Sequence, residues 1–222
     1  MATNSYPERR FKHITALTGG LILLLSFVSL LSGRNYQGLN PVFNLAETPP
    51  LVMSGGDPYI RALMRMISAS ESNDRRPYAV LYGGSHIDDL SRHPEKCIRI
   101  VNGPNMNNCS TAAGRYQMIN TTWAGMAKRY HPQHDCMLFV FQCNYSFEPK
   151  YQDKVVHDWL KDEKFWGMNI SQSLKDGKLE QVRKRLSSTW TSLGYGIETN
   201  SMTSQLSGIY QRLVDEELKR KA

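Results

Sequence analysis

Residues 57–71 read DPYIRALMRMISASE and carry the clearest structural signal in the chain. Asp57 followed by Pro58 is typical of a helix start, because an aspartate side chain caps free backbone N–H groups and proline suits the first helical position. The apolar residues that follow recur at helical spacing, namely Ile60, Leu63, Met64 and Ile67. Glu71 continues this stripe one turn later. The pattern therefore predicts an amphipathic helix that ends with a carboxylate turned toward the core.

Beyond this helix the sequence changes from β-type to helical patterns. Residues 78–82 and 97–101 are short β-prone runs bounded by Gly83-Gly84 and Asn102-Gly103, and we expect them to form a small antiparallel element. After Ser110 the apolar residues return to helical spacing in four segments. They are Ile119, Trp123, Met126 and Tyr130; Val155, Val156, Trp159 and Leu160; Leu179, Val182, Leu186 and Trp190; and Leu206, Ile209, Tyr210, Leu213 and Val214. The predicted fold class is α+β, one mostly helical domain with a small β element after its first helix.

The N-terminus has the pattern of an export signal. No residue from Ile14 to Ser32 is charged, and Arg9, Arg10 and Lys12 precede this apolar run. A run of this length can cross a bilayer as a helix, and its basic flank favours a cytoplasmic N-terminus. We expect an uncleaved transmembrane signal anchor, with a cleaved signal peptide as the alternative.

This signal sets the expected domain organisation. A basic cytoplasmic segment (1–13) precedes the membrane helix (14–32), a linker without periodicity (33–56) follows it, and a single catalytic domain (57–222) completes the chain. The domain would then lie on the exported, periplasmic or extracytoplasmic side of the membrane.

Composition is that of an ordinary globular protein. The chain has 222 residues, of which 41% are hydrophobic and 21% charged, with a formal net charge of +7. That surplus suits an anionic polymer such as a cell wall, and it is too small and dispersed to indicate nucleic-acid binding. Four cysteines downstream of an export signal argue for an oxidising compartment.

Glu71 has a structural and a functional interpretation. It could be a terminal glutamate or a member of a buried salt bridge. Alternatively, a carboxyl desolvated by apolar neighbours has a raised pKa and can deliver a proton near neutral pH, as a general acid at a glycosidic oxygen must. A glutamate, then a small β element, then helices is also the order expected of a lysozyme-type cleft.

Several segments together resemble one known family. The most specific is STAAGRYQ at 110–117, followed by Trp123. The others, in collinear order, are 66–71 with 73–74, 78–84, 89–96, 149–153, 186–190 and 194–196. These segments resemble the lambda-type phage endolysins, which are lysozyme-like lytic transglycosylases that cleave peptidoglycan without water.

The resemblance implies a mechanism centred on Glu71, without a cofactor or a metal. The family's single glutamate, which matches Glu71, protonates the oxygen between muramic acid and glucosamine. It then takes the proton from the muramic acid's own 6-hydroxyl as that oxygen closes on the anomeric carbon, giving a 1,6-anhydro sugar. An intramolecular nucleophile has a high effective molarity, so no second carboxylate is needed. The expected partner is the glycan strand of peptidoglycan.

Seven residues are expected to bind sugar. The Gly114 backbone would allow close approach, Gln117 could pair with an N-acetyl group, and Tyr116 could offer a ring face, although Tyr116 could equally pack in the core. Trp123 is expected in the core. The full set, on the resemblance, is Tyr78, Tyr82, Gly114, Arg115, Tyr116, Gln117 and Tyr195.

The cysteines suggest two short disulfide loops. The even count and short separations favour pairing Cys97 with Cys109 and Cys136 with Cys143. The run from His131 to Cys136 leaves a zinc site as the alternative.

Two further functions compete with transglycosylation. Asp88 or Asp89 could serve as the second carboxylate of a hydrolytic muramidase if it lay about 5 to 9 Å from Glu71 across the cleft. A non-catalytic, wall-binding module is the third candidate.

Overall fold

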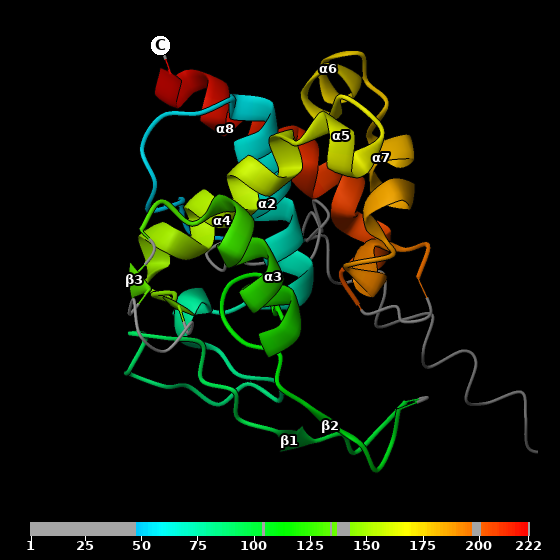
Figure 1. Cartoon of the computed structure of the whole chain (residues 1–222). Coiled ribbons are helices and arrows are strands. Elements are labelled where there is room, and N and C mark those ends of the chain that lie inside the picture. Colours follow the sequence, from blue (N-terminus) through cyan, green and yellow to red (C-terminus); the bar gives the residue numbers. More distant parts are fainter. Residues whose placement is uncertain (1–47, 104, 134, 137–142, 197–200, 222) are drawn as a thin grey trace, which may run out of the picture. The chain divides into compact units, whose positions relative to one another are not determined.

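The computed structural model describes residues 48–103, 105–133, 135–136, 143–196 and 201–221, and helices dominate this part of the chain (Figure 1). The helices are α2 (Pro58–Glu71), α3 (Asn120–Tyr130), α4 (Pro149–Lys161), α5 (Glu163–Trp166), α6 (Ile170–Lys175), α7 (Leu179–Leu186) and α8 (Leu206–Lys221). Short 3-10 turns are η2 (Pro77–Ala79), η3 (Thr191–Leu193) and η4 (Thr203–Gln205). Two antiparallel pairs join β1 (Ile98–Arg99) to β2 (Cys109–Ser110) and β3 (Asp135–Cys136) to β4 (Cys143–Asn144).

Helix α2 forms where the sequence predicts it. The Asp57 side chain accepts hydrogen bonds from the backbone N–H groups of Tyr59 (2.9 Å) and Ile60 (3.3 Å). The predicted stripe of Ile60, Leu63, Met64 and Ile67 is 0% exposed. It packs against α4, α6 and α8, so α2 is the central helix of this part (Figure 1). Burying each of these side chains contributes roughly 1.5 to 3 kcal/mol.

The other predicted stripes supply most of the remaining core. Those of α4 and α8 are buried throughout. In each of the other two predicted segments, which correspond to α3 and α7, one residue of the stripe lies outside the helix. Ile119 is extended, precedes α3 and is 43% exposed, whereas Trp190 follows the end of α7 and is 3% exposed.

The small β element has other partners than expected. Residues 78–82 and 97–101 do not pair with each other. Pro77 starts a 3-10 turn, so the first run makes only isolated bridges, between Val80 and His86 and between Leu81 and Ala113. The second run supplies β1, which pairs with β2 in the register Arg99 to Cys109.

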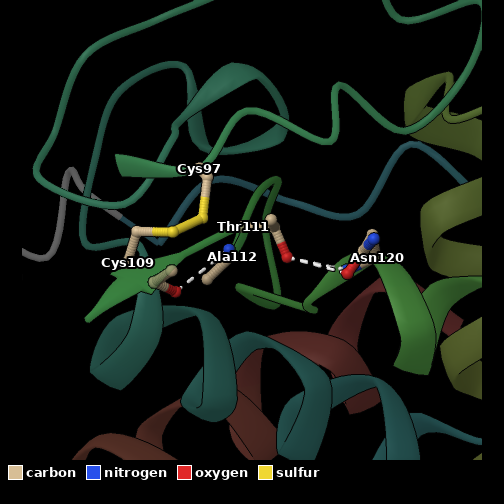
Figure 2. Close-up of a disulfide and its surroundings, with 6 residues drawn as sticks. Cys97, Cys109, Thr111, Ala112 and Asn120 are labelled. Atoms are coloured by element: carbon tan, nitrogen blue, oxygen red, sulfur yellow. Dashed lines mark hydrogen bonds between the residues drawn. A yellow bond between two sulfur atoms is a disulfide. The ribbon is translucent and has the colours of Figure 1, made fainter. Parts of the chain in front are cut away.

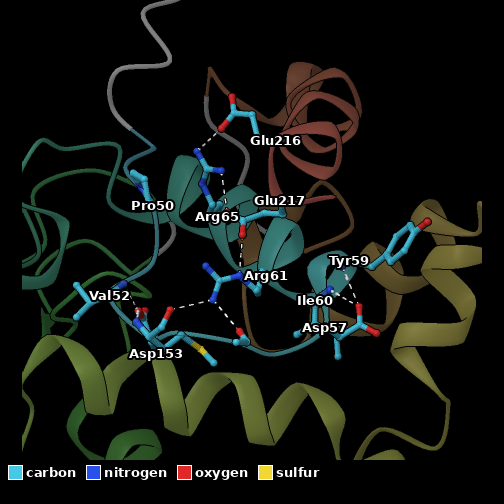
Figure 3. Close-up of polar contacts among 12 residues, drawn as sticks. Pro50, Val52, Asp57, Tyr59, Ile60, Arg61, Arg65, Asp153, Glu216 and Glu217 are labelled. Atoms are coloured by element: carbon cyan, nitrogen blue, oxygen red, sulfur yellow. Dashed lines mark hydrogen bonds and ion pairs between the residues drawn. The ribbon is translucent and has the colours of Figure 1, made fainter. Parts of the chain in front are cut away.

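The end of the predicted linker is packed on the domain (Figure 3). Arg65 donates to the Thr48 carbonyl at 2.9 Å, and Arg61 donates to the carbonyls of Met53 and Gly55, each at 2.9 Å. Asp153 accepts from the Val52 N–H at 2.8 Å. Residues at the end of the predicted linker are therefore hydrogen-bonded to α2 and to α4, and the boundary at residue 57 stays a prediction.

The expected membrane helix, residues 14–32, lies outside the described residues. Within the ranges that the structure describes, no helix has both the length and the apolar character needed to cross a bilayer.

Candidate active site

Glu71 borders a pocket of about 400 Å³. One side, here called the helical wall, combines the end of α2 (Ser70 and Glu71) with the segment 189–192. A second group of lining residues, here called the hairpin wall, comes from β1, β2 and the described residues between them, and consists of Ile100, Asn105 and Ser110. The remaining lining residues are Tyr82, Ala112, Gln117 and Ile119.

The helical wall is fixed by an aromatic cluster in the core. The ring of Trp190 lies 5.2 Å from that of Trp159 and 6.5 Å from that of Trp166, measured between centroids. Its indole N–H donates to the Tyr116 carbonyl at 3.0 Å. Since Trp190 is 3% exposed, the segment that follows it is held against the end of α2.

Ser192, in this segment, contacts the glutamate directly. Its hydroxyl donates to Oε1 of Glu71. The Ser70 hydroxyl in turn donates to Ser192 Oγ at 2.7 Å. Glu71 is therefore a partly buried carboxylate whose orientation is set by side chains from both parts of the helical wall.

The hairpin wall is closed by a disulfide (Figure 2). Cys97 and Cys109 are bonded, with Cα atoms 5.2 Å apart, which confirms the predicted pairing. Just beyond β2, Thr111 Oγ1 donates to Asn120 Oδ1 at 3.0 Å and accepts from the Asn120 N–H at 3.1 Å. These bonds tie the base of the hairpin to the first residue of α3.

Two of the predicted sugar-binding residues, Tyr82 and Gln117, line the pocket. The Gln117 amide nitrogen donates to the carbonyls of Val80 (3.2 Å) and Gly114 (3.0 Å). An amide nitrogen has two hydrogens to donate, so the side-chain oxygen is what remains for a ligand.

Three other predicted residues belong to a buried polar cluster centred on Asp153. Tyr116 is 0% exposed and donates to Asp153 at 2.6 Å, and Tyr78 donates to the same carboxylate at 2.8 Å. Arg115 is 0% exposed and donates to Tyr78 Oη at 2.9 Å and to the Pro50 carbonyl at 3.1 Å. Burial raises the pKa of both phenols, which keeps them protonated as donors. These side chains do not line the pocket, and the fully buried Tyr116 has no ring face to offer a sugar.

Gly114 and Tyr195 also lie outside the pocket lining. Gly114 has a φ of +72°, and a Cβ there would collide with the side chain of Gln152. The glycine is thus required by close packing with α4. Tyr195 is 49% exposed, and its hydroxyl donates to Glu180 at 2.6 Å.

Comparisons with known proteins show the family of the chain. The family model described as "Endolysin" matches residues 61–215, which include every residue that lines the pocket. The chain belongs to the endolysin family. It is 29% identical over 146 residues to the endolysin of Escherichia phage lambda, an alignment that covers 61% of this chain and 79% of the phage protein.

A solved structure supports the fold. The bacteriophage lambda lysozyme complexed with a chitohexasaccharide matches with a TM-score of 0.51 and 26% identity, over 72% of this chain and 97% of that one. This endolysin is thus a lysozyme-like, peptidoglycan-degrading glycosidase, helical with a small antiparallel sheet.

Asp88 and Asp89, the candidate second carboxylates of a muramidase, are not among the described residues that line the Glu71 pocket. Asp88 is exposed and pairs with Arg76 at 2.8 Å, and Asp89 accepts from the Ser91 N–H at 2.9 Å. Hydrogen bonds from Ser91 lower the pKa of Asp89. Both aspartates line a different surface pocket, of about 560 Å³. Among the described residues around the Glu71 pocket, Glu71 is the one carboxylate.

The possible zinc ligands are divided between described and undescribed residues. His131 is buried, with Nδ1 and Nε2 next to the carbonyls of Gln133 (2.5 Å) and Ser146 (3.1 Å). His134 lies outside the described residues. In the part of the chain that is described, no three His, Cys, Asp or Glu side chains are grouped to hold a metal ion.

The predicted second disulfide, between Cys136 and Cys143, lies close in sequence to these histidines. Cys136 lies opposite Cys143 in the β3–β4 register, but the side chains of both residues lie outside what the structure describes. This pairing stays a prediction.

Sequence reasoning missed the segment 189–192 and the hairpin residues Ile100 and Asn105. A signal for the former was present, because the family-like runs 186–190 and 194–196 flank Thr191–Leu193 on both sides. Ile100 and Asn105 lie between the family-like segments 89–96 and 110–117, outside both of them, so they offered no comparable signal.

Proposed function

We propose that this endolysin is a lytic transglycosylase that cleaves the β-1,4 bond between N-acetylmuramic acid and N-acetylglucosamine, with Glu71 as acid and then base. The observation that supports this most strongly is the single carboxylate among the described residues of the pocket. A mechanism with a protein nucleophile or a protein-activated water needs a second one.

The reaction needs one group that gives a proton and takes one back. Protonated Glu71 donates to the glycosidic oxygen as the bond from that oxygen to the anomeric carbon breaks. The muramic acid's 6-hydroxyl oxygen then bonds to the anomeric carbon and releases its proton to the Glu71 carboxylate. The product is a 1,6-anhydro end, and Glu71 returns to its starting protonation state.

The walls of the pocket suit a glycan. Ile100 and Ile119 provide apolar surface for a pyranose, and Gln117 provides a polar atom. The lambda lysozyme was solved with a chitohexasaccharide, and we propose that this chain likewise binds a glycan strand across the pocket.

We also propose that residues 14–32 anchor the enzyme in the membrane with the catalytic domain on the exported side. Because residues from Thr48 onward contact the domain, the tether in this proposal is at most residues 33–47. At that length the domain would reach only wall close to the membrane.

The variant Glu71→Gln tests the assignment, because the amide is nearly isosteric and cannot donate the proton. We expect at least about a hundredfold loss of kcat with unchanged thermal unfolding and glycan binding. Wild-type turnover by this variant would remove Glu71 from the mechanism, and wild-type chain without lytic activity on purified peptidoglycan would favour a wall-binding module.

A further inference from the structure

Two serine hydroxyls and the Glu71 carboxylate form a directed chain of hydrogen bonds. Ser70 Oγ donates to Ser192 Oγ at 2.7 Å, and Ser192 Oγ donates to Glu71 Oε1. A serine hydroxyl has only one hydrogen. Because Ser192 accepts from Ser70, its own hydrogen is directed at the glutamate.

The backbone around Ser192 is held on several sides. Thr203 Oγ1 donates to the Ser192 carbonyl at 2.9 Å. The guanidinium of Arg183 on α7 donates to the next carbonyl, that of Leu193, at 2.8 and 3.0 Å. Ser70 and Ser192 are 7% and 8% exposed. Free rotation of the Ser192 side chain away from Glu71 would leave buried hydroxyls without these partners, which is costly.

We propose that Ser192 is a positioning residue that determines which oxygen of Glu71 exchanges the catalytic proton. The inference rests on the proposed role of Glu71 as acid and base. A protonated carboxyl keeps one oxygen as an acceptor, and the Ser192 hydroxyl needs an acceptor. Oε1 therefore stays unprotonated, and Oε2 carries the proton to the glycosidic oxygen and receives it from the 6-hydroxyl.

This role predicts a specific change in the pH profile. Donation of a hydrogen bond favours the charged carboxylate, so loss of the Ser192 donor raises the pKa of Glu71 and moves the basic limb of the kcat profile to higher pH. Tyr82 is the other titratable side chain among the described pocket residues. A shift of this limb that Ser192→Ala causes and a control serine variant does not therefore reports on Glu71, the carboxylate that Ser192 contacts.

The experiment uses the full chain and soluble glycan strands. We expect Ser192→Ala to lower kcat by roughly tenfold with KM within about twofold, and to move the basic limb upward. Ser192→Thr keeps a hydroxyl and should recover most of kcat. Ser70→Ala, which removes only the first donor, should lower kcat by about twofold to threefold and shift the limb in the same direction.

Ser187→Ala is the matched control. Ser187 is a buried serine at the end of α7 whose hydroxyl donates to the Arg183 carbonyl at 2.8 Å, away from the pocket lining. This variant should keep wild-type kcat and pH profile.

The outcomes separate this proposal from the proposed function. If Glu71→Gln is inactive while Ser192→Ala has the kcat and pH profile of wild type, the positioning role is wrong and Glu71 stands. If Ser192→Ala lowers both kcat and the unfolding temperature but leaves the pH profile unchanged, the positioning role is also wrong, because a serine with a purely structural role would behave in this way. An active Glu71→Gln would instead remove the proposed function.

Discussion

The helical wall and the hairpin wall of the Glu71 pocket are held in place by different means. The helical wall rests on the buried face of α2 and on the cluster of Trp159, Trp166 and Trp190. The hairpin wall consists of two strands of two residues each, closed by the bond between Cys97 and Cys109. Its residues Val101 and Met106 are 66% and 55% exposed.

The difference suggests that the two walls have different roles in catalysis and in substrate binding. Glu71, the Ser192 hydroxyl that donates to it and the Ser70 hydroxyl that donates to Ser192 are all on the helical wall, which rests on the core. The hairpin wall contributes Ile100, Asn105 and Ser110 to the pocket, and none of these three side chains has a carboxyl group. We therefore expect damage to the helical wall to affect stability and kcat, and damage to the hairpin wall to affect mainly KM.

Removal of the Trp190 side chain should have the largest effect on stability. Trp190→Ala leaves a cavity next to two other tryptophans and is expected to lower the free energy of unfolding by about 3 to 5 kcal/mol, measured by urea denaturation. Phe165→Ala is the control, since Phe165 touches Trp159 at 5.5 Å between centroids but is 41% exposed. A Trp190→Ala loss no larger than that of the control would mean that the cluster does not support the helical wall.

Breaking the hairpin disulfide should mainly weaken substrate binding. The double variant Cys97→Ser with Cys109→Ser is expected to lose at most about 3 kcal/mol of stability, the loop-closure value for this separation. KM for soluble glycan should rise roughly tenfold while kcat stays within about threefold. Cys136→Ser with Cys143→Ser, in the separate β3–β4 pair, is the control and should leave KM unchanged. If Cys97→Ser with Cys109→Ser lowers kcat and kcat/KM by the same factor, the hairpin wall does not act mainly through substrate binding.

Asp57 stabilises the helical wall from its far end. Burial alone would raise the pKa of Asp57, but hydrogen bonds from Ser171, Lys175 and the first-turn amides outweigh it, so the pKa is lowered. Asp57→Ala should cost about 1 kcal/mol at neutral pH, and Asp57→Asn, which can still cap α2, clearly less.

The sign of the pH dependence follows from the lowered pKa. The stabilising contribution is present above the unfolded-state pKa of about 3.9 and is lost as the pH falls through the folded-state value. The difference between wild type and Asp57→Ala should therefore shrink in acid. A difference that grows below pH 4, measured by thermal unfolding across pH, would contradict this assignment.

The smallest effects are expected at the carboxylates outside both walls. Asp88→Asn and Asp89→Asn should each leave kcat within about threefold of wild type, since neither side chain reaches the pocket. A loss comparable to that of Glu71→Gln would place a second carboxylate in the reaction and favour hydrolysis.

The parts of the site that the sequence predicted are those encoded by local signals. The cap at Asp57 and the apolar stripe of α2 fix the helix and thereby the position of Glu71. The positions of Arg115 and Tyr116 outside the pocket lining could not be predicted from local sequence, because their environment depends on Asp153 and on residues 48–53, which are distant in sequence. Ser192 was missed because its position depends on the packing of Trp190, which no local pattern reveals.

The most direct test of the proposed transglycosylase mechanism is the chemistry of the glycan ends that the enzyme releases. Peptidoglycan digested by the full chain in water enriched in heavy oxygen should yield muropeptides with 1,6-anhydro ends and no heavy oxygen, as judged by mass spectrometry. The expectation follows from a pocket in which the substrate supplies the nucleophile and Glu71 moves the proton. Reducing ends that carry heavy oxygen would show that water attacks the anomeric carbon, and would contradict the transglycosylase mechanism.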